Sequence, residues 1–192
     1  MTQDRGRVRA TFDEIARNFQ ALGQQAEAVE DAARTIADAL RAGGKVMFCG
    51  NGGSAADSQH LAAEMTGRFI KDRKPLAAIA LSTDTSALTC ISNDYSFDDV
   101  FARQVEGLGR AGDCLIAIST SGNSRNVIKA VEAARSLGIG CIALSGRKGG
   151  ALATLCDLAL VVPSDTTARI QEAHILIGHT LCGIVEARLG LA

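Results

Sequence analysis

Residues 45–69, KVMFCGNGGSAADSQHLAAEMTGRF, form the first recognisable folding unit of the chain. An apolar run at 46–49 ends in a glycine turn, and a helical segment follows in which Ser54 is a suitable N-cap. A strand, a tight turn and a helix start leave backbone N–H groups free to hold an anion. On the predicted helix, His60 and Glu64 are four residues apart and therefore share one face.

Strands and helices alternate after this unit. Apolar runs predict four further strands, at 75–81, 113–119, 141–146 and 158–163. Helical segments between and after them are expected at 85–92, 97–108, 125–137 and 167–189. Such alternation indicates an α/β fold with a parallel sheet covered by helices. Five parallel strands most often adopt the flavodoxin-like order 2-1-3-4-5, with ligands bound where the loops after strands one and three meet.

The N-terminal region, residues 8–41, is predicted to be helical and divided into two helices at Gly23. It carries no recognisable chemistry, so it packs against the rest of the domain or against another subunit, and we favour the second. The chain is therefore expected to be a single domain of residues 1–192. Residues 1–43 would be a helical extension used in oligomer packing, and 44–192 the α/β core with the last helix.

Composition argues against several classes of protein. The net charge is −1, tryptophan is absent and there is one tyrosine, which disfavours a nucleic-acid-binding surface. No apolar run approaches the ~20 residues of a membrane span, and the N-terminus lacks the apolar core of a signal peptide. Six cysteines occur without a CxxC pair, mostly inside apolar runs. We expect reduced, buried thiols in a cytoplasmic protein with no membrane or nucleic-acid partner.

The loop 119–124, STSGNS, follows the third predicted strand and precedes a helix. Hydroxyl groups and free N–H groups at the positive end of a helix dipole suit a phosphate monoester. The loop is not a P-loop, because the GxxxxGK[ST] lysine is missing. The alternative is an ordinary serine-rich turn with an N-cap, but a second glycine–serine loop at the same switch point favours phosphate binding.

A metal site is the second candidate, because His60 and Glu64 form an HxxxE pair and the last helix carries more potential ligands. The pair alone could be a solvated contact worth a few tenths of a kcal/mol. Gln171 and His179 are eight residues apart, which is about 12 Å along a regular helix and about 80° around it. Sharing one metal would require extended side chains, an irregular helix or a neighbouring subunit. His174 is a rival ligand, or a purely structural histidine.

Four segments together resemble the phosphoheptose isomerases, which belong to the SIS (sugar isomerase) class: CGNGGSAADSQHLAAEMTGRF, SNDYSF, ISTSGNSRNVIKA and RIQEAHILIGHTLC. The similarity covers nearly the whole chain. It implies the SIS fold and conversion of D-sedoheptulose 7-phosphate to D-glycero-D-manno-heptose 7-phosphate. That reaction opens the route to ADP-heptose for lipopolysaccharide. The resemblance also implies a cytoplasmic homotetramer with active sites between subunits, and one zinc ion per subunit.

The resemblance also assigns roles to residues. The metal positions fall on His60, Glu64, Gln171 and His179. The substrate positions fall on Asn51, Gly52, Gly53, Asn93, Asp94, Ser119, Thr120, Ser121 and Ser124, with Glu64 and Gln171 also touching substrate. We add Ser54, which adjoins the glycine turn, and expect Glu64 as the catalytic base and His179 as its acid/base partner. Some relatives carry other residues where Ala55 and Ala56 stand, without consequence for the chemistry.

Two other functions remain open at this point. Some relatives of the family are non-catalytic tetramers that bind the bacterial replication initiator, and SIS domains also act as phosphosugar sensors in regulators. The initiator-binding relatives lack the Glu64 and His179 groups, which this chain has. Isomerisation of another phosphosugar is the second alternative, because residue types do not indicate pocket depth.

Overall fold

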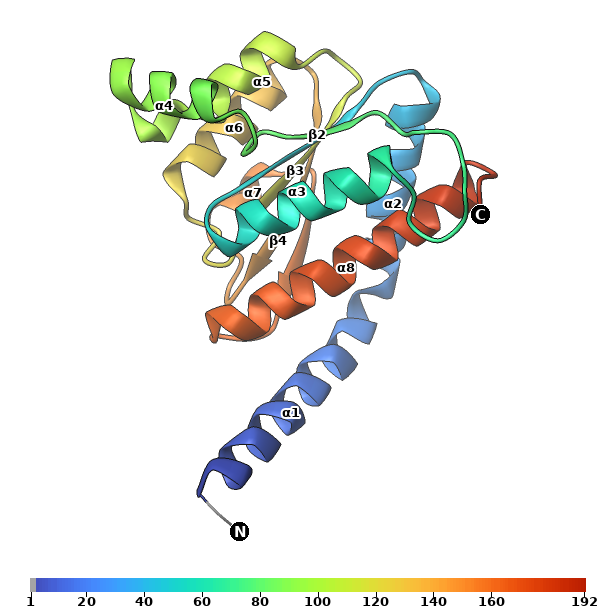
Figure 1. Ribbon diagram of the computed structural model, residues 1–192, viewed down its shortest axis with the longest axis vertical. Helices are drawn as coiled ribbons and strands as arrows, with labels where there is room; N and C mark the ends of the chain where they lie inside the picture. The colour runs from blue at the N-terminus through green and yellow to red at the C-terminus, as the bar shows by residue number, and fades with distance from the viewer. Residues whose placement is uncertain (1–2) are drawn as a thin grey trace.

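The computed structural model describes residues 3–192, and its centre is a five-stranded sheet with helices on both faces (Figure 1). The strands are β1 (Val46–Gly50), β2 (Ala78–Ala80), β3 (Cys114–Ser119), β4 (Gly140–Gly146) and β5 (Leu158–Val162). Their order in the sheet is β2-β1-β3-β4-β5, and every neighbouring pair is parallel. The predicted flavodoxin-like order is therefore confirmed.

The helices follow the predicted alternation. The longer ones are α1 (Gln3–Leu22), α2 (Ala26–Arg41), α3 (Gly53–Thr66), α4 (Thr85–Asp94), α6 (Arg125–Ser136) and α8 (Thr167–Arg188). The shorter ones are η1 (Gly23–Gln25), η2 (Phe97–Asp99), α5 (Ala102–Leu108) and α7 (Leu152–Leu155). Helices α3 and α8 lie side by side across one face of the sheet (Figure 1).

Two apolar cores lie on opposite faces of the sheet, because successive strand residues point to opposite sides. Phe48 and Ile116 join a core with α2, α3 and α8. Met47 and Leu115 join a second core with α4, α5, α6 and α7. Every residue of β1 and β3 is buried, which explains why their apolar runs are continuous in the sequence.

Two predicted elements differ from the structure, and one short helix was not predicted. The strand expected at 75–81 is limited to Ala78–Ala80, because the N–H of Leu76 bonds to Met65 O at the end of α3 instead of joining the sheet. The helix expected at 97–108 is interrupted between η2 and α5. The four-residue helix α7 was not predicted, being too short for a periodic pattern.

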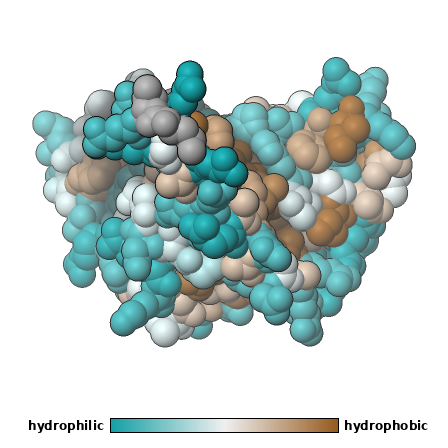
Figure 2. Space-filling model, turned by 90° about the horizontal axis from the view of Figure 1, so that it is seen from below, coloured by the Kyte–Doolittle hydropathy of each residue, from teal (hydrophilic) through white to brown (hydrophobic). Residues whose placement is uncertain are grey.

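The N-terminal helices divide at Gly23 as predicted, and α1 extends away from the sheet (Figure 1). The Gln25 side chain fastens the junction to β5, donating to Val161 O at 2.7 Å and accepting from Val161 N at 3.0 Å. Apolar side chains remain exposed on α1, with Val8 at 53% and Phe12 at 65%. Apolar patches also interrupt the hydrophilic surface seen from below (Figure 2).

Within residues 3–192 no helix is both long and apolar enough to cross a bilayer. All six cysteines are free, four of them are buried, and only Cys90 is exposed.

Candidate active site

The glycine turn after β1 starts α3 earlier than the sequence suggested. Gly52, with a φ of +56°, occupies the N-cap position, so the prediction of Ser54 as N-cap is wrong. The positive φ reverses the chain at once, and the amides of Ser54 and Ala55 already bond to Asn51 O and Gly52 O. Ser54 is buried inside the first turn. This turn therefore offers fewer free N–H groups to an anion than expected.

The hydroxyl loop, residues 119–124, is the better anion site. Ser119 Oγ lies 2.9 Å from Ser124 Oγ and 3.4 Å from Ser121 Oγ, so three predicted substrate residues share one cluster. Ser124 is the N-cap residue of α6, and its own side chain makes no capping bond. Thr120 lies between these serines and is half-buried. Hydroxyl donors gathered at the start of a twelve-residue helix can hold a phosphate group.

The shape of this loop depends on close backbone packing. Gly122 has a φ of +67°, and a Cβ there would lie 1.8 Å from the carbonyl oxygen of Gly149. The Asn123 side chain holds the same two segments together, because it accepts from Ala151 N at 3.0 Å and donates to Ser121 O at 3.0 Å. The loop is thus held against residues 149–151 before any ligand binds, which lowers the entropic cost of binding.

A pair of asparagines joins the two loops at the switch point between β1 and β3. Asn51 and Asn126 exchange two hydrogen bonds of 2.8 Å through their side-chain amides. Asn126 lies in the first turn of α6 and is 3% exposed. The glycine turn and the hydroxyl loop are therefore adjacent, as the strand order predicted. Sequence reasoning missed Asn126, although a polar residue beside the apolar face of α6 was a usable signal.

His60, Glu64 and His179 meet between α3 and α8. His60 Nε2 lies 2.9 Å from His179 Nε2 and 3.3 Å from Glu64 Oε1. One ligand atom from each residue lies within 4.8 Å of the other two. Two imidazole nitrogens this close need a proton or a cation between them, because their lone pairs repel. The Phe69 ring, which sequence reasoning did not single out, packs on His179 with centroids 5.5 Å apart.

This donor set fits a divalent metal. Zinc takes histidine nitrogen and carboxylate oxygen at about 2.0–2.2 Å, which separates tetrahedral ligands by roughly 3.4 Å. The observed separations of 2.9 and 3.3 Å are slightly shorter than this, so a small outward movement of the side chains would fit the ion. The three groups are also partly open to solvent, so an ion and a ligand oxygen can reach them.

Gln171, the fourth predicted metal residue, lies near the start of α8. Helix α8 is continuous, which rules out the irregular helix that would have brought Gln171 towards His179. The Gln171 amide lies instead against the glycine turn, where a Cβ on Gly53 would come within 2.2 Å of its Nε2 atom. Gln171 is thus placed beside the predicted substrate turn.

His174, the rival ligand, points into the protein. It is fully buried, and its Nε2 lies 3.0 Å from the carbonyl oxygen of Ser145 on β4. Burial lowers the pKa of His174 to about 4, so the ring is neutral and donates this bond. Its Nδ1 atom has no hydrogen-bond partner in the described structure. His174 therefore anchors α8 to the sheet and lies apart from the metal group.

Asn93 and Asp94, two further predicted substrate residues, lie at the C-terminal end of α4. Both are exposed, and the Asn93 side chain donates to Asp94 Oδ1 at 2.7 Å. No side-chain hydrogen bond in residues 3–192 connects them to the hydroxyl loop.

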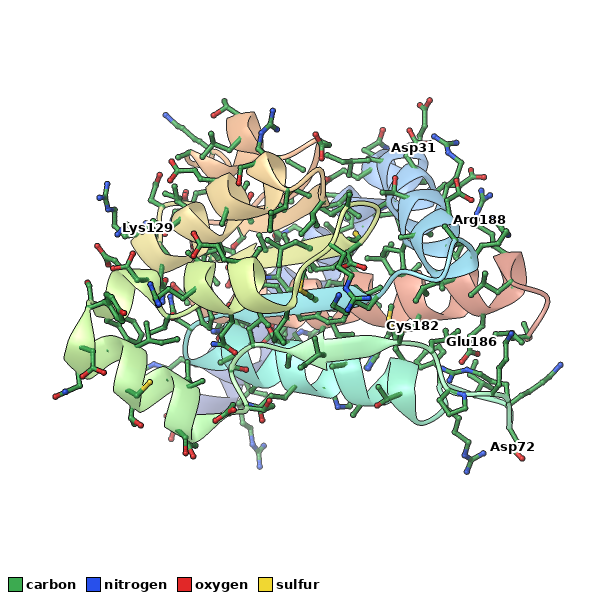
Figure 3. The ribbon with its side chains drawn as sticks, turned by 90° about the horizontal axis from the view of Figure 1, so that it is seen from above. Asp31, Asp72, Lys129, Cys182, Glu186 and Arg188 are labelled. Atoms are coloured by element: carbon green, nitrogen blue, oxygen red, sulfur yellow. The ribbon has the colours of Figure 1, made fainter. Side chains whose placement is uncertain are left out.

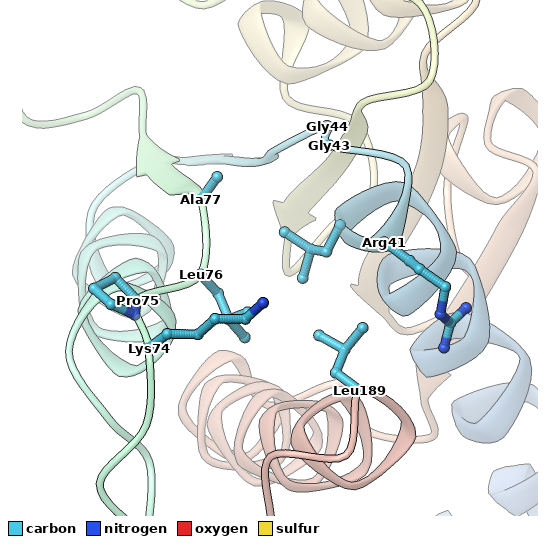
Figure 4. Close-up of a pocket in the computed structure, with 9 residues that line it drawn as sticks. Arg41, Gly43, Gly44, Lys74, Pro75, Leu76, Ala77 and Leu189 are labelled. Atoms are coloured by element: carbon cyan, nitrogen blue, oxygen red, sulfur yellow. The ribbon is translucent and has the colours of Figure 1, made fainter.

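A cavity of about 390 Å³ lies at the opposite end of the sheet, between the ends of α2 and α8 and the segment before β2 (Figure 4). Leu40, Arg41, Lys74, Leu76 and Leu189 are among its lining residues. It includes none of the predicted site residues. Active sites in parallel α/β sheets lie at the carboxyl ends of the strands, so this cavity is not the candidate site.

Comparison with known proteins gives a consistent result. The family model for the SIS domain matches residues 11–146. The phosphoheptose isomerase of Rhodospirillum rubrum is 56% identical over 95% of this chain and 97% of its own length. That of Akkermansia muciniphila is 53% identical over 91% of this chain and 93% of its own length.

Solved structures support the same relationship. The phosphoheptose isomerase of Neisseria gonorrhoeae matches with a TM-score of 0.90 and 51% identity, covering 95% of this chain and 98% of its own. That of Francisella tularensis matches with a TM-score of 0.93 and 39% identity, covering 97% of this chain and 100% of its own. The family match covers the glycine turn, α3 and the hydroxyl loop, and the sequence identity and shared fold extend over 95% or more of the chain in three of these relatives. This chain belongs to the phosphoheptose isomerase family of SIS-domain proteins.

Proposed function

We propose that this chain converts D-sedoheptulose 7-phosphate to D-glycero-D-manno-heptose 7-phosphate, a step towards ADP-heptose for lipopolysaccharide. The observation that carries the proposal is the meeting of His60, Glu64 and His179 on adjacent helices. Ketose–aldose isomerisation needs a base, an acid and stabilisation of negative charge on oxygen, which these groups supply. The phosphoheptose isomerases described above supply the substrate class.

The hydroxyl loop would bind the phosphate end of the sugar. Ser119, Ser121 and Ser124 form one cluster at the start of α6, and Thr120 lies within the same loop. The substrate would also pass the adjacent glycine turn, where the predicted contacts are Asn51, Gly52, Gly53, Ser54 and Gln171. Contacts to the phosphate, remote from the reacting carbons, would orient the sugar so that its C1 and C2 atoms face Glu64.

Glu64 would remove the proton alpha to the carbonyl and return it to the neighbouring carbon through an enediol. Its carboxylate is only partly exposed, with 21% of the side chain accessible, and α3 holds it towards His60 and His179. His179, whose imidazole packs on the Phe69 ring, would move the proton between the two oxygens.

A zinc ion would be held by His60, Glu64 and His179, with Gln171 as a fourth ligand only if a second copy supplies it. When bound, zinc supplies Lewis-acid polarisation of the substrate oxygens. Ligation would lower the basicity of Glu64, so metal binding and proton abstraction by this carboxylate would compete.

We further propose a cytoplasmic homotetramer. The six free cysteines suit a reducing compartment. The exposed apolar side chains of Val8 and Phe12 on α1 suit packing between subunits. Residues 1–43 would supply the packing surface, and 44–192 the core of the single domain. Retention of both Glu64 and His179 favours the isomerase over the initiator-binding alternative.

The test is an isomerase assay on the purified protein with sedoheptulose 7-phosphate, following aldose formation with and without chelator. Product that is lost with chelator and restored by zinc, but not by magnesium, supports both the reaction and the metal. Product that is unaffected after the bound metal has been shown to be removed supports the enzyme alone. No product from folded protein with zinc would overturn the proposal, and other phosphorylated ketoses would then be tried.

A further inference from the structure

A buried ion pair closes the C-terminal end of the two helices that carry the candidate catalytic groups. The Arg73 guanidinium and the Glu186 carboxylate are each 3% exposed, and Arg73 Nε lies 2.8 Å from Glu186 Oε1. Arg73 comes from the segment that returns from α3 to β2, and Glu186 from the last turns of α8. Figure 3 shows Glu186 on α8 beside the segment that carries Asp72.

The same guanidinium caps helix α3. It donates to the carbonyl oxygen of Glu64 at 2.8 Å, of Met65 at 2.7 Å and of Gly67 at 2.9 Å. Carbonyls in the last turn of a helix have no partner within that helix, and a cation there also interacts favourably with the helix dipole. One of these carbonyls belongs to Glu64 itself, so the cap acts on the backbone of the candidate base.

Glu186 carries the connection to the histidine. The same Oε1 atom that binds Arg73 also accepts the backbone N–H of Phe69 at 3.2 Å. Phe69 then places its ring 5.5 Å from the imidazole of His179, measured between centroids. Arg73 thus binds the backbone of Glu64, and Glu186 binds the backbone of Phe69, whose ring packs on His179.

We propose that Arg73 and Glu186 are positioning residues that set the distance and orientation between Glu64 and His179. This inference rests on the proposed function, because it gives the pair a role in that same reaction. A buried ion pair is weak evidence for stability, since desolvation offsets most of its attraction. Its hydrogen bonds, however, join three carbonyls at the end of α3 to the Glu186 side chain of α8 through one planar group, which a lysine cannot reproduce.

The discriminating variant is Arg73→Lys, which keeps the charge but not the fork of donors. We expect kcat to fall by roughly 10- to 100-fold, the usual effect of removing a group that orients a ligand. KM should change by less than about threefold, because the hydroxyl loop is not touched. Zinc affinity, measured by titration of the metal-free protein, should fall by roughly tenfold.

Glu186→Gln is the conservative partner variant. Its amide oxygen can still accept from Arg73 and from the Phe69 amide, so kcat should stay within about tenfold of the unaltered chain. Lys45→Met is the matched control, since Lys45 pairs with the buried Asp113 at the amino end of the strands. It should lower the unfolding temperature and leave kcat unchanged. If Arg73→Lys fails to fold, the double variant Arg73→Met with Glu186→Gln removes both charges and should show the same loss of kcat.

Three outcomes would overturn the inference. The first is an Arg73→Lys protein with unchanged kcat. The second is an equal loss of kcat in Lys45→Met, which would make destabilisation the cause. The third is a crystal structure of Arg73→Lys in which the Phe69 ring and Glu64 keep their places beside His179. An inactive unaltered chain would instead count against the proposed function, and the crystal structure would then decide the positioning role alone.

Discussion

The hydroxyl loop and the histidine–carboxylate group, His60 with Glu64 and His179, are built in opposite ways. The loop is held by a positive-φ glycine, a backbone contact and several internal hydrogen bonds. The histidine–carboxylate group consists of three partly exposed side chains that contact one another across two helices. The first arrangement suits binding a constant part of a substrate, and the second suits groups that gain and lose protons. The two regions should therefore fail differently when altered.

Glu64→Gln should have the largest effect, because it removes the base while preserving size and hydrogen bonding. We expect kcat to fall by at least ~10²-fold, equal to about 2.7 kcal/mol of activation free energy. KM should change little, since the hydroxyl loop is intact. Steady-state kinetics measure this, with Glu30→Gln, an exposed carboxylate paired with Arg188 on another face, as the control. A near-normal kcat would remove Glu64 from the role of base.

Acidification should weaken the contact between α8 and β4 near the hydroxyl loop and so lower the stability of the fold. His174 bonds to Ser145 O, and Ser145 pairs with Ser119 in the sheet. Its pKa falls from 6.5 unfolded to about 4 folded, so the unfolded chain binds more protons between these values. The contribution of neutral His174 to the free energy of unfolding is fully present above about pH 6.5 and is lost as the pH falls to about 4. The loss is on the order of 3 kcal/mol at most.

Denaturant unfolding at pH 7 and pH 5 measures this difference. His174→Gln, which cannot titrate but can donate to the Ser145 carbonyl, should flatten the dependence on pH. Asp57, whose pKa is raised by burial, acts in the opposite direction in both proteins and cancels in the comparison. Equal slopes in the two proteins would contradict the prediction.

Ser121→Ala should affect binding and not chemistry. Losing one hydroxyl donor to a charged phosphate costs about 1.5 kcal/mol, so KM should rise roughly tenfold. The change in kcat should be smaller than that in KM, the reverse of Glu64→Gln. Ser136→Ala, which removes a hydroxyl bonded to Ala133 O at the other end of α6, is the control. An unaltered KM would place the phosphate elsewhere.

The strands and the loops that carry the two regions could largely be predicted from the sequence, because buried parallel strands have continuous apolar runs. Strands β1 and β3 are buried along their whole length, and their loops were correctly paired at the switch point. The short strand β2 was overestimated, because an edge strand pairs on one side and Leu76 bonds to α3 instead. Ser54 was misplaced because Gly52 begins the helix with a backbone conformation that composition alone does not specify.

The contacts between helices could not be predicted in the same way. Spacing placed His60 and Glu64 on one face, but it did not say which turn of α8 would face them. That depends on Gly178, where a Cβ would lie 2.5 Å from the Leu61 side chain and force the helices apart. The parallel packing then puts His179 beside His60 and Gln171 beside the glycine turn, an alignment of the two helices that local sequence does not encode.

The smallest expected effect tests whether stability and activity are separable away from both regions. Asp84 is the N-cap of α4 and accepts from Ala87 N at 2.9 Å. Asp84→Ala should cost about 1 kcal/mol of unfolding free energy, and Asp84→Asn, which keeps the acceptor, should cost less. Thermal unfolding should shift by about 2–4 °C with unchanged kcat. A rise in KM would mean that the position of α4 matters to substrate, as expected if Asn93 and Asp94 at its far end contact the sugar. A fall in kcat would instead show that a small loss of stability disturbs the histidine–carboxylate group. The different responses of the two regions to substitution would then reflect their stability and not their chemical roles.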